Sequence, residues 1–236
     1  ALQAQGTKVL VDWDQLLIPP DQLKTGSGDP YRVYGPFWRN WRGQVEQRWA
    51  AGALNSSPAP AGLLDLDATT LKSPALAGLL QQSQASASLD HGFAGTALCP
   101  CRPGEAAAQE QLQLFCEGKG REGALLAYGE GRNIPSEAGT SVLSAALAFG
   151  TLSPRQAWGA AQAAKELARS DEARESITVW EQELAWREFY QQALFHFPEL
   201  AEGPYRPQWR QFPWENDPER LAAWRDGLTG MPIIDA

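Results

Sequence analysis

Eight consecutive residues in the C-terminal third of the chain, Glu183–Tyr190 (ELAWREFY), combine a carboxylate, a guanidinium group and large aromatic rings. Residues spaced three, four and seven apart lie along one stripe of a helix. Here these residues are Glu183, Trp186, Arg187 and Tyr190. A carboxylate beside an indole face can hydrogen-bond the polar edge of a flat base while the indole stacks on its surface. The alternative is an intrahelical Glu183–Arg187 ion pair beside a tryptophan of the core.

A second candidate site is the segment Gly139–Ser144 (GTSVLS), where three hydroxyl groups fall at the start of an expected helix. These hydroxyls belong to Thr140, Ser141 and Ser144. Together with the free N–H groups of a helix N-terminus, they could cradle a phosphate or pyrophosphate. The alternative is an ordinary capping segment in which Thr140 or Ser141 is the N-cap.

The segment from Tyr31 to Trp49 mixes four arginines with several aromatic side chains. Such a mixture suits base stacking combined with phosphate contacts. The alternative is a helix whose aromatic rings belong to the core and whose arginines face solvent. The chain as a whole has a formal net charge of −8. We therefore expect any DNA contact to depend on a local patch and not on overall charge.

Several other chemistries have no support in the sequence. The two histidines, His91 and His196, have no cysteine or carboxylate neighbours at the spacing of metal ligands, so we expect no metal site. No nucleophile elbow is present, and no glycine-rich phosphate loop of the Walker or dinucleotide type occurs.

The elements that must position these residues are mainly helical. Lys8–Trp13 is the one convincing strand, and the proline- and glycine-rich stretch after it, with the Ala- and Ser-rich residues 55–88, indicates a long connection. Hydrophobic periodicity and capping signals predict three helices. They are a helix from Pro103 with Ala108, Leu112 and Phe115 on one face, a helix opened by Ser153-Pro154 that ends near Arg169, and a deeply placed helix over Ser176–Phe197.

The chain has 236 residues, 43% of them hydrophobic, which is enough to form a globular core. No apolar run is long enough to span a membrane. Met231 is the single methionine, so we expect an internal fragment of a longer protein. The three cysteines cannot all pair within one chain, which favours reduced thiols and a cytoplasmic location.

Taken together, six segments resemble the photolyase and cryptochrome family, and most closely the class I cyclobutane pyrimidine dimer photolyases of the cyanobacterial kind. They occur in the family's order over nearly the whole chain. They are Trp13–Leu17 (WDQLL), Pro30–Trp41 (PYRVYGPFWRNW), Tyr128–Ser144, Glu183–Tyr190, Phe212–Asn216 (FPWEN) and Thr229–Ala236.

This resemblance implies a two-domain parent protein, with an N-terminal α/β (Rossmann-like) antenna domain, a long linker and an all-helical FAD-binding domain. In this mainly α fragment, residues 1–30 would be the C-terminal end of the α/β domain and residues 31–102 the interdomain linker. Residues 103–236 would be the N-terminal half of the helical domain.

The resemblance also implies roles for individual residues. FAD contacts would come from Tyr128 and from Thr140, Ser141, Val142, Leu143 and Ser144, with the hydroxyls and amides facing the phosphates. Contacts to DNA and to the flipped-out dimer would come from Arg132, Glu183, Trp186, Arg187 and Tyr190. Trp214 would be the outermost member of the family's tryptophan electron relay.

The reaction implied is light-driven repair: excited reduced FAD gives an electron to the cyclobutane dimer, the ring splits, and the electron returns. The partner would be damaged DNA, bound by a monomeric protein, and the fragment alone is expected to be inactive. A second, antenna chromophore of deazaflavin or folate type could serve the parent protein, although Ala148 stands where deazaflavin-binding members carry a lysine.

Two other functions remain open from the sequence. One is a cryptochrome-type blue-light photoreceptor on the same fold, whose members often alter the dimer-binding tryptophan. Trp186 beside Glu183 favours repair over this alternative. The other is a helical binding module without flavin, which would require the resemblance to be misleading.

Overall fold

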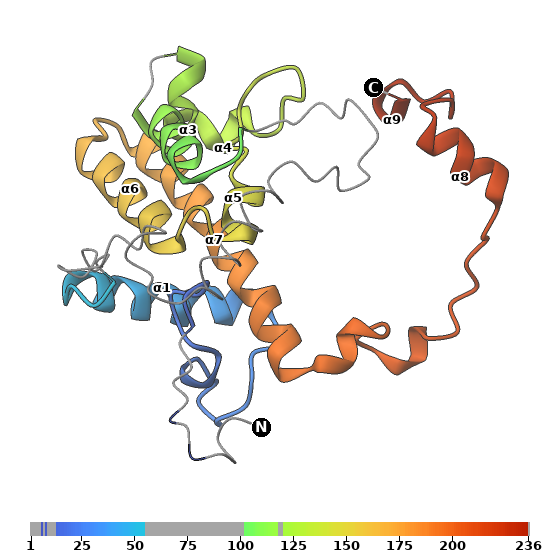
Figure 1. Cartoon of the computed structure of the whole chain (residues 1–236), viewed down its shortest axis with the longest axis horizontal. Coiled ribbons are helices and arrows are strands. Elements are labelled where there is room, and N and C mark those ends of the chain that lie inside the picture. The colour runs from blue at the N-terminus through green and yellow to red at the C-terminus, as the bar shows by residue number, and fades with distance from the viewer. Residues whose placement is uncertain (1–5, 7, 9–12, 55–101, 118–119, 236) are drawn as a thin grey trace, which may run out of the picture. The chain divides into compact units, whose positions relative to one another are not determined.

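The computed structural model describes residues 6, 8, 13–54, 102–117 and 120–235 (Figure 1). It is mainly helical, as predicted, and no β-strand occurs in this part of the chain. The predicted strand over Lys8–Trp13 and the connecting residues 55–88 lie largely or wholly outside the described residues. The chain divides into two compact units, Ala1–Tyr190 and Gln191–Ala236.

Unit 1 is built around the long helix α7 (Asp171–His196), which continues into unit 2. Its buried residues recur at helical spacing and include Ile177, Trp180, Leu184 and Ala185. No residue from Ser176 to Phe189 is fully exposed, which confirms the prediction of a deeply placed helix for this part. Its last turns are shallower, since Tyr190, Leu194 and Phe195 are exposed. The helix begins at Asp171, five residues before the predicted start. The predicted start was late because the first turn is charged and carries no apolar signal.

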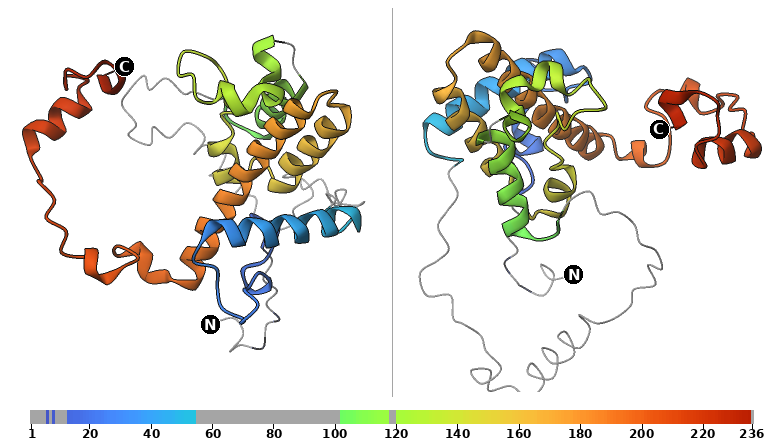
Figure 2. Two further views of the ribbon diagram at one scale, coloured as in Figure 1. Left: turned by 180° about the vertical axis from the view of Figure 1, so that it is seen from behind. Right: turned by 90° about the horizontal axis from the view of Figure 1, so that it is seen from above.

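The other helices of unit 1 pack around α7 (Figure 2). They are α1 (Tyr34–Ala50), α3 (Glu105–Glu117), α4 (Tyr128–Gly131), α5 (Ser144–Phe149) and α6 (Pro154–Leu167), with 3₁₀ turns η2 (Pro20–Gln22) and η3 (Gly120–Ala127). Both views show α1 crossing α7, whereas α6 runs beside α7.

Helix α1 differs from the linker expected over residues 31–102. Phe37, Trp41 and Val45 recur every four residues and are buried in the core of unit 1. The Trp41 and Trp158 rings meet edge to face, with centroids 5.6 Å apart, which joins α1 to α6. The aromatic rings at the centre of Tyr31–Trp49 therefore belong to the core, as the alternative interpretation of that segment expected. A linker would have to be confined to residues outside α1.

Two further predicted helices are confirmed with small shifts at their ends. Helix α3 begins at Glu105 and not at Pro103, and it buries Ala108, Leu112 and Phe115 as expected. Helix α6 begins directly after Ser153, whose side chain accepts the N–H of Arg155, while the Gln156 side chain accepts the N–H of Ser153. This capping box fixes the start of α6.

Unit 2 has the short elements η4 (Pro198–Ala201), η5 (Pro207–Trp209), α8 (Pro218–Arg225) and α9 (Pro232–Asp235). Asp217 caps α8 by accepting the N–H groups of Glu219 and Arg220. These four elements bury none of their own residues. Among the helices that the structure describes, none has the length and apolarity needed to cross a bilayer.

Candidate functional site

The predicted phosphate-binding segment, residues 139–144, packs against α4 through Gly139, which is buried. A Cβ atom at Gly139 would lie 2.3 Å from the carbonyl oxygen of Gly131, so only glycine allows this approach. The Ser141 carbonyl accepts a hydrogen bond from Gln111 Nε2 at 3.1 Å, which ties the segment to α3. Residues 140–144 are thereby held close to the end of α4.

The helix after this segment begins later than the sequence suggested. Helix α5 starts at Ser144 and its N-cap is Leu143, so neither Thr140 nor Ser141 caps it. Val142 precedes the cap in the left-handed region, with φ of 53°. Within the described residues, the hydroxyls of Thr140 and Ser144 are exposed and make no hydrogen bond to the protein. Free hydroxyls beside free backbone N–H groups form a donor set that fits the phosphates of FAD.

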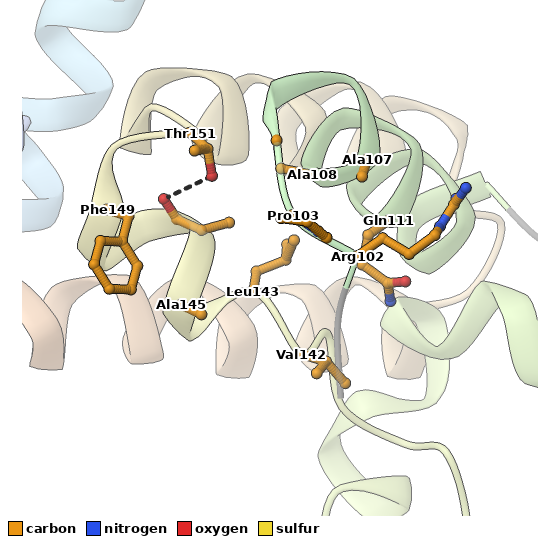
Figure 3. A pocket seen from close by; sticks show the side chains of 12 residues that line it. Arg102, Pro103, Ala107, Ala108, Gln111, Val142, Leu143, Ala145, Phe149 and Thr151 are labelled. Carbon is orange, nitrogen blue, oxygen red and sulfur yellow. Dashed lines mark hydrogen bonds between the residues drawn. The ribbon is translucent and has the colours of Figure 1, made fainter. Parts of the chain in front are cut away.

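Val142 and Leu143 also line a pocket with a volume of about 300 Å³ (Figure 3). Its walls come from the start of α3 and from α5, with Pro103 and Ala107 opposite Ala145 and Phe149. The pocket is mostly apolar, with Arg102 and Gln111 as its long polar side chains. Of the predicted FAD-contact residues, Val142 and Leu143 thus line an apolar pocket, whereas Thr140 and Ser144 carry exposed hydroxyls.

Tyr128 is the first residue of α4 and is buried. Its ring packs edge to face on Phe115, with centroids 6.0 Å apart, and the guanidinium carbon of Arg132 lies 5.5 Å from its centroid on the helix's next turn. Burial is the main reason that the pKa of Tyr128 is raised, and the nearby carboxylate of Glu183 adds to it. Tyr128 is therefore a neutral ring wall at physiological pH.

Arg132 and Glu183 meet across the space between α4 and α7. Arg132 Nη1 donates a hydrogen bond to Glu183 Oε1 at 2.5 Å. Both side chains are partly exposed, with 35% and 42% of their surface accessible. The sequence predicted both residues as DNA or dimer contacts, and the structure brings them together. The alternative interpretation, an intrahelical Glu183–Arg187 pair, differs from the structure, because the cation beside Glu183 is Arg132, directly after α4.

Trp186 lies one turn after Glu183 on α7 and is only partly exposed. Its ring system stacks on Tyr34 of α1, with centroids 3.4 Å apart and planes 6° from parallel. Phe189 meets the indole edge to face at 5.7 Å, and Tyr190 stacks at 5.6 Å with a 23° tilt. Tyr34 and Tyr190 are thus the two rings that stack with the indole among its described neighbours.

Arg187 occupies a different environment from the one predicted. Its guanidinium donates to the backbone carbonyls of Gln15, at 2.7 Å, and Leu147, at 2.9 Å. Burial lowers the pKa of this guanidinium. The side chain connects α7 to the N-terminal segment and to α5. Tyr190, by contrast, is 65% exposed and lies beside Trp186.

Trp214 belongs to unit 2, where it is 72% exposed. Its ring lies 4.8 Å from that of Phe212, centroid to centroid. Both rings line an open hollow of about 500 Å³ together with Pro204, Trp209 and Arg210.

Two buried carboxylates were missed in the sequence. Glu188 accepts hydrogen bonds from Leu17 N at 2.5 Å, Ile18 N at 3.3 Å and Trp41 Nε1 at 2.7 Å. Burial raises its pKa to about 7, although these donors oppose the shift. Nothing in the local sequence indicates this role of Glu188, because its hydrogen-bond donors come from distant segments of the chain.

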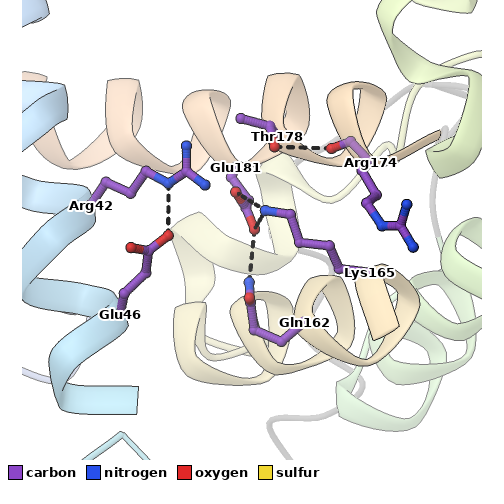
Figure 4. Close-up of polar contacts among 7 residues, drawn as sticks. All are labelled: Arg42, Glu46, Gln162, Lys165, Arg174, Thr178 and Glu181. Atoms are coloured by element: carbon purple, nitrogen blue, oxygen red, sulfur yellow. Dashed lines mark hydrogen bonds and ion pairs between the residues drawn. The ribbon is translucent and has the colours of Figure 1, made fainter. Parts of the chain in front are cut away.

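The second buried carboxylate is Glu181, which is fully buried between α6 and α7 (Figure 4). Lys165 Nζ contacts both of its oxygens at 2.8 and 2.9 Å, and Gln162 Nε2 donates to Oε1 at 2.7 Å. Its position four residues after Ile177, on the buried stripe, was the available signal.

In the part of the chain that the structure describes, no three His, Cys, Asp or Glu side chains gather as a metal site would require.

Two family models match this chain. The FAD binding domain of DNA photolyase matches residues 180–236, and the DNA photolyase model matches residues 1–60. The first match contains Glu183, Trp186 and Trp214, and the second contains Tyr34.

Relatives with curated names cover the same region. A deoxyribodipyrimidine photo-lyase from a Synechococcus species is 50% identical over 239 residues, which is 100% of this chain and 46% of that protein. A deoxyribodipyrimidine photo-lyase from Agrobacterium fabrum is 37% identical over 224 residues, which is 94% of this chain and 42% of that protein. The chain thus spans less than half the length of these two relatives.

A solved cryptochrome structure from a Synechocystis species has the same fold over 99% of this chain and 45% of its own, with a TM-score of 0.65 and 22% identity. At this identity the likeness concerns the fold alone. The two family models at the two ends of the chain, and the relatives that match it throughout, lead to one assignment. The chain belongs to the DNA photolyase family.

Proposed function

We propose that this chain is part of a light-driven DNA repair enzyme that splits cyclobutane pyrimidine dimers with electrons from reduced FAD. The observation that carries the proposal is the Arg132–Glu183 pair next to the Tyr34–Trp186 stack, which sets a cation, a carboxylate and a held indole on one side of α7. The 50% identity to a deoxyribodipyrimidine photo-lyase and the match to an FAD binding domain support it.

The substrate of this site is a dimer turned out of the DNA stack. Enzymes that act on a base inside a duplex flip it into a pocket with stacking faces and edge contacts. Trp186 supplies the stacking face, on the side away from Tyr34, and Glu183 accepts a hydrogen bond at the base edge. Arg132 holds the Glu183 carboxylate in place and adds positive charge toward the phosphates. Tyr190, which is exposed beside Trp186, extends the contact surface.

Arg187 has a positioning role in this proposal in place of direct DNA contact. Two of its five N–H donors already bind backbone carbonyls, and these bonds fix the direction of the guanidinium. By joining Gln15 and Leu147 to α7, it holds the helix that carries Glu183 and Trp186.

The cofactor of the proposed reaction is FAD, and it supplies the photoexcited electron when bound. The hydroxyls and N–H groups of residues 140–144 would hold its phosphates, while Tyr128 forms one wall of its site. Trp214 would be the outermost member of an electron relay, and its 72% exposure suits exchange with an external reductant. The free thiol of Cys116 supports a cytoplasmic location.

The experiment measures affinities of the FAD-loaded full-length protein for an oligonucleotide with one thymine dimer and for its undamaged counterpart. Trp186→Ala should weaken dimer binding by about 5- to 150-fold, because stacking contributes about 1–3 kcal/mol per base. Binding of undamaged DNA should change little, since it depends on phosphate contacts. Trp186→Phe, which keeps a flat ring, is the matched variant and should lose much less.

Equal weakening of damaged and undamaged DNA by Trp186→Ala would contradict the proposed role. Loss of the folded state in this variant, with Trp186→Phe unchanged in binding and selectivity, would instead assign Trp186 to the core.

A further inference from the structure

Trp186 needs a fixed orientation if a base is to stack on it, and the described contacts of Tyr34 could provide that orientation. Tyr34 is the first residue of α1, so its backbone belongs to a rigid element of the core. Its ring lies flat on Trp186, with centroids 3.4 Å apart and planes 6° from parallel. A ring stacked in this way limits the freedom of the indole to turn.

The hydroxyl group of Tyr34 fixes the ring from the other end. It donates a hydrogen bond to the backbone carbonyl of Gln182 at 3.0 Å. In an α-helix this carbonyl also accepts the N–H of the residue four positions later, which is Trp186. The phenol thus reaches the same turn of α7 that carries the indole. Because burial and the nearby Glu183 raise its pKa, the hydroxyl stays protonated and remains a donor.

Two neighbouring rings hold Tyr34 from its sides. Phe189 meets it edge to face with centroids 5.8 Å apart, and Phe37 lies 6.4 Å away with a 31° tilt. Phe37 is buried in the core. The Tyr34 ring therefore has a stacked partner, two flanking rings and a hydrogen bond, which together fix its orientation.

We infer that Tyr34 is a positioning residue for recognition of the damaged base: it covers one face of Trp186 and presents the opposite face to the flipped dimer. This inference rests on the proposed function, because it assigns Tyr34 a part in the same binding site. A pre-oriented side chain avoids the cost of immobilisation on binding, which is about 0.5–1.5 kcal/mol for a flexible side chain, or about 2- to 12-fold in affinity.

The test uses the FAD-loaded full-length protein and the ratio of its affinities for dimer-containing and undamaged oligonucleotides. Tyr34→Leu keeps apolar volume but removes the flat face, so it should reduce this ratio by about 2- to 12-fold. Tyr34→Phe keeps the ring and should retain most of the ratio. In a Trp186→Ala background, Tyr34→Leu should cause no further loss, because Tyr34 acts through the indole.

Trp38→Leu is the matched control, since Trp38 is a partly buried aromatic residue on the same helix whose described stacking partner is Trp41. It should change thermal stability without changing the affinity ratio. Equal loss of the ratio in Trp38→Leu, or a further loss caused by Tyr34→Leu in the Trp186→Ala background, would overturn the inference. If Trp186→Ala lowers the ratio while Tyr34→Leu leaves it unchanged, this inference alone fails. If Trp186→Ala itself leaves the ratio unchanged, the proposed function fails first.

Discussion

Glu188 shows how one buried side chain can join distant parts of the chain. Its carboxylate accepts hydrogen bonds from the backbone N–H groups of residues 17 and 18 and from the indole N–H of Trp41. Its carboxyl group is completely buried, and desolvation raises its pKa to about 7 from an ordinary value of 4.5. The group therefore connects α7 to α1 and to the N-terminal segment, at a cost in solvation that depends on pH.

This pKa shift predicts a pH dependence of stability. Between pH 4.5 and pH 7 the folded protein keeps a proton on Glu188 that the unfolded chain has released. The contribution of this group to the free energy of unfolding is therefore largest below pH 4.5 and decreases by about 3 kcal/mol as the pH rises through this range. Urea unfolding of the wild type and Glu188→Gln at several pH values would measure it, because the variant lacks the titrating group.

The free energy of unfolding of Glu188→Gln should lie below that of the wild type by a larger amount at pH 5 than at pH 7.5. Glu188→Gln should already be less stable by about 1–3 kcal/mol at pH 7.5, since an amide turns a donor toward N–H groups that need an acceptor. The half-exposed Glu46 provides a control, Glu46→Gln, that should preserve the wild-type pH dependence. A constant difference between wild type and Glu188→Gln over this range would contradict the shifted titration.

At the scale of elements, the start of α6 tests how far local sequence fixes a helix. Ser153 and Gln156 form a reciprocal capping box before an amphipathic run. Ser153→Ala removes the acceptor for a helix N–H and should cost about 1 kcal/mol in the free energy of unfolding. Gln156→Ala removes the other arm and should cost less. Unfolding curves that coincide for Ser153→Ala and the wild type would show that packing of α6 against α7 alone sets this helix start.

Elements with local signals were predictable, and contacts between elements were not. The periodic apolar positions of α3 predicted its start to within two residues, and the Ser-Pro signal and apolar pattern of α6 predicted both of its ends to within two residues. For α1, its aromatic content left two interpretations open, and only packing against α6 and α7 decides between them. The charged first turn of α7 carries no hydrophobic period, so its start was placed too late.

The site shows the same division. Helical spacing predicted that Glu183 and Trp186 lie on neighbouring turns, and it left a Glu183–Arg187 pair open as an alternative. The observed cation is Arg132, 51 residues earlier in the chain, which no local pattern can indicate. The stack of Tyr34 on Trp186 also joins segments far apart in sequence, so the sequence singled out Trp186 but gave no indication of Tyr34 as its partner.

At the scale of the whole molecule, the proposed function assigns the described residues to one part of a larger site. This chain covers 46% of a deoxyribodipyrimidine photo-lyase that it matches at 50% identity. In this proposal, the hydroxyls of residues 140–144 and the ring of Tyr128 would contact FAD, whereas Glu183 and Trp186 would contact a damaged base. Light-driven repair requires both sets of residues in one protein, because the electron must pass from the flavin to the dimer.

Direct measurement of dimer splitting is the clearest test of this account. The full-length protein with pre-reduced FAD would be mixed with a thymine-dimer oligonucleotide and divided between blue light and darkness, and the remaining dimers would be counted by chromatography. We predict that dimers disappear in the light, with restored thymines in equal proportion, and persist in the dark. Reduced flavin that absorbs the light while bound dimers remain intact would contradict the assignment and would indicate a photoreceptor on the same fold.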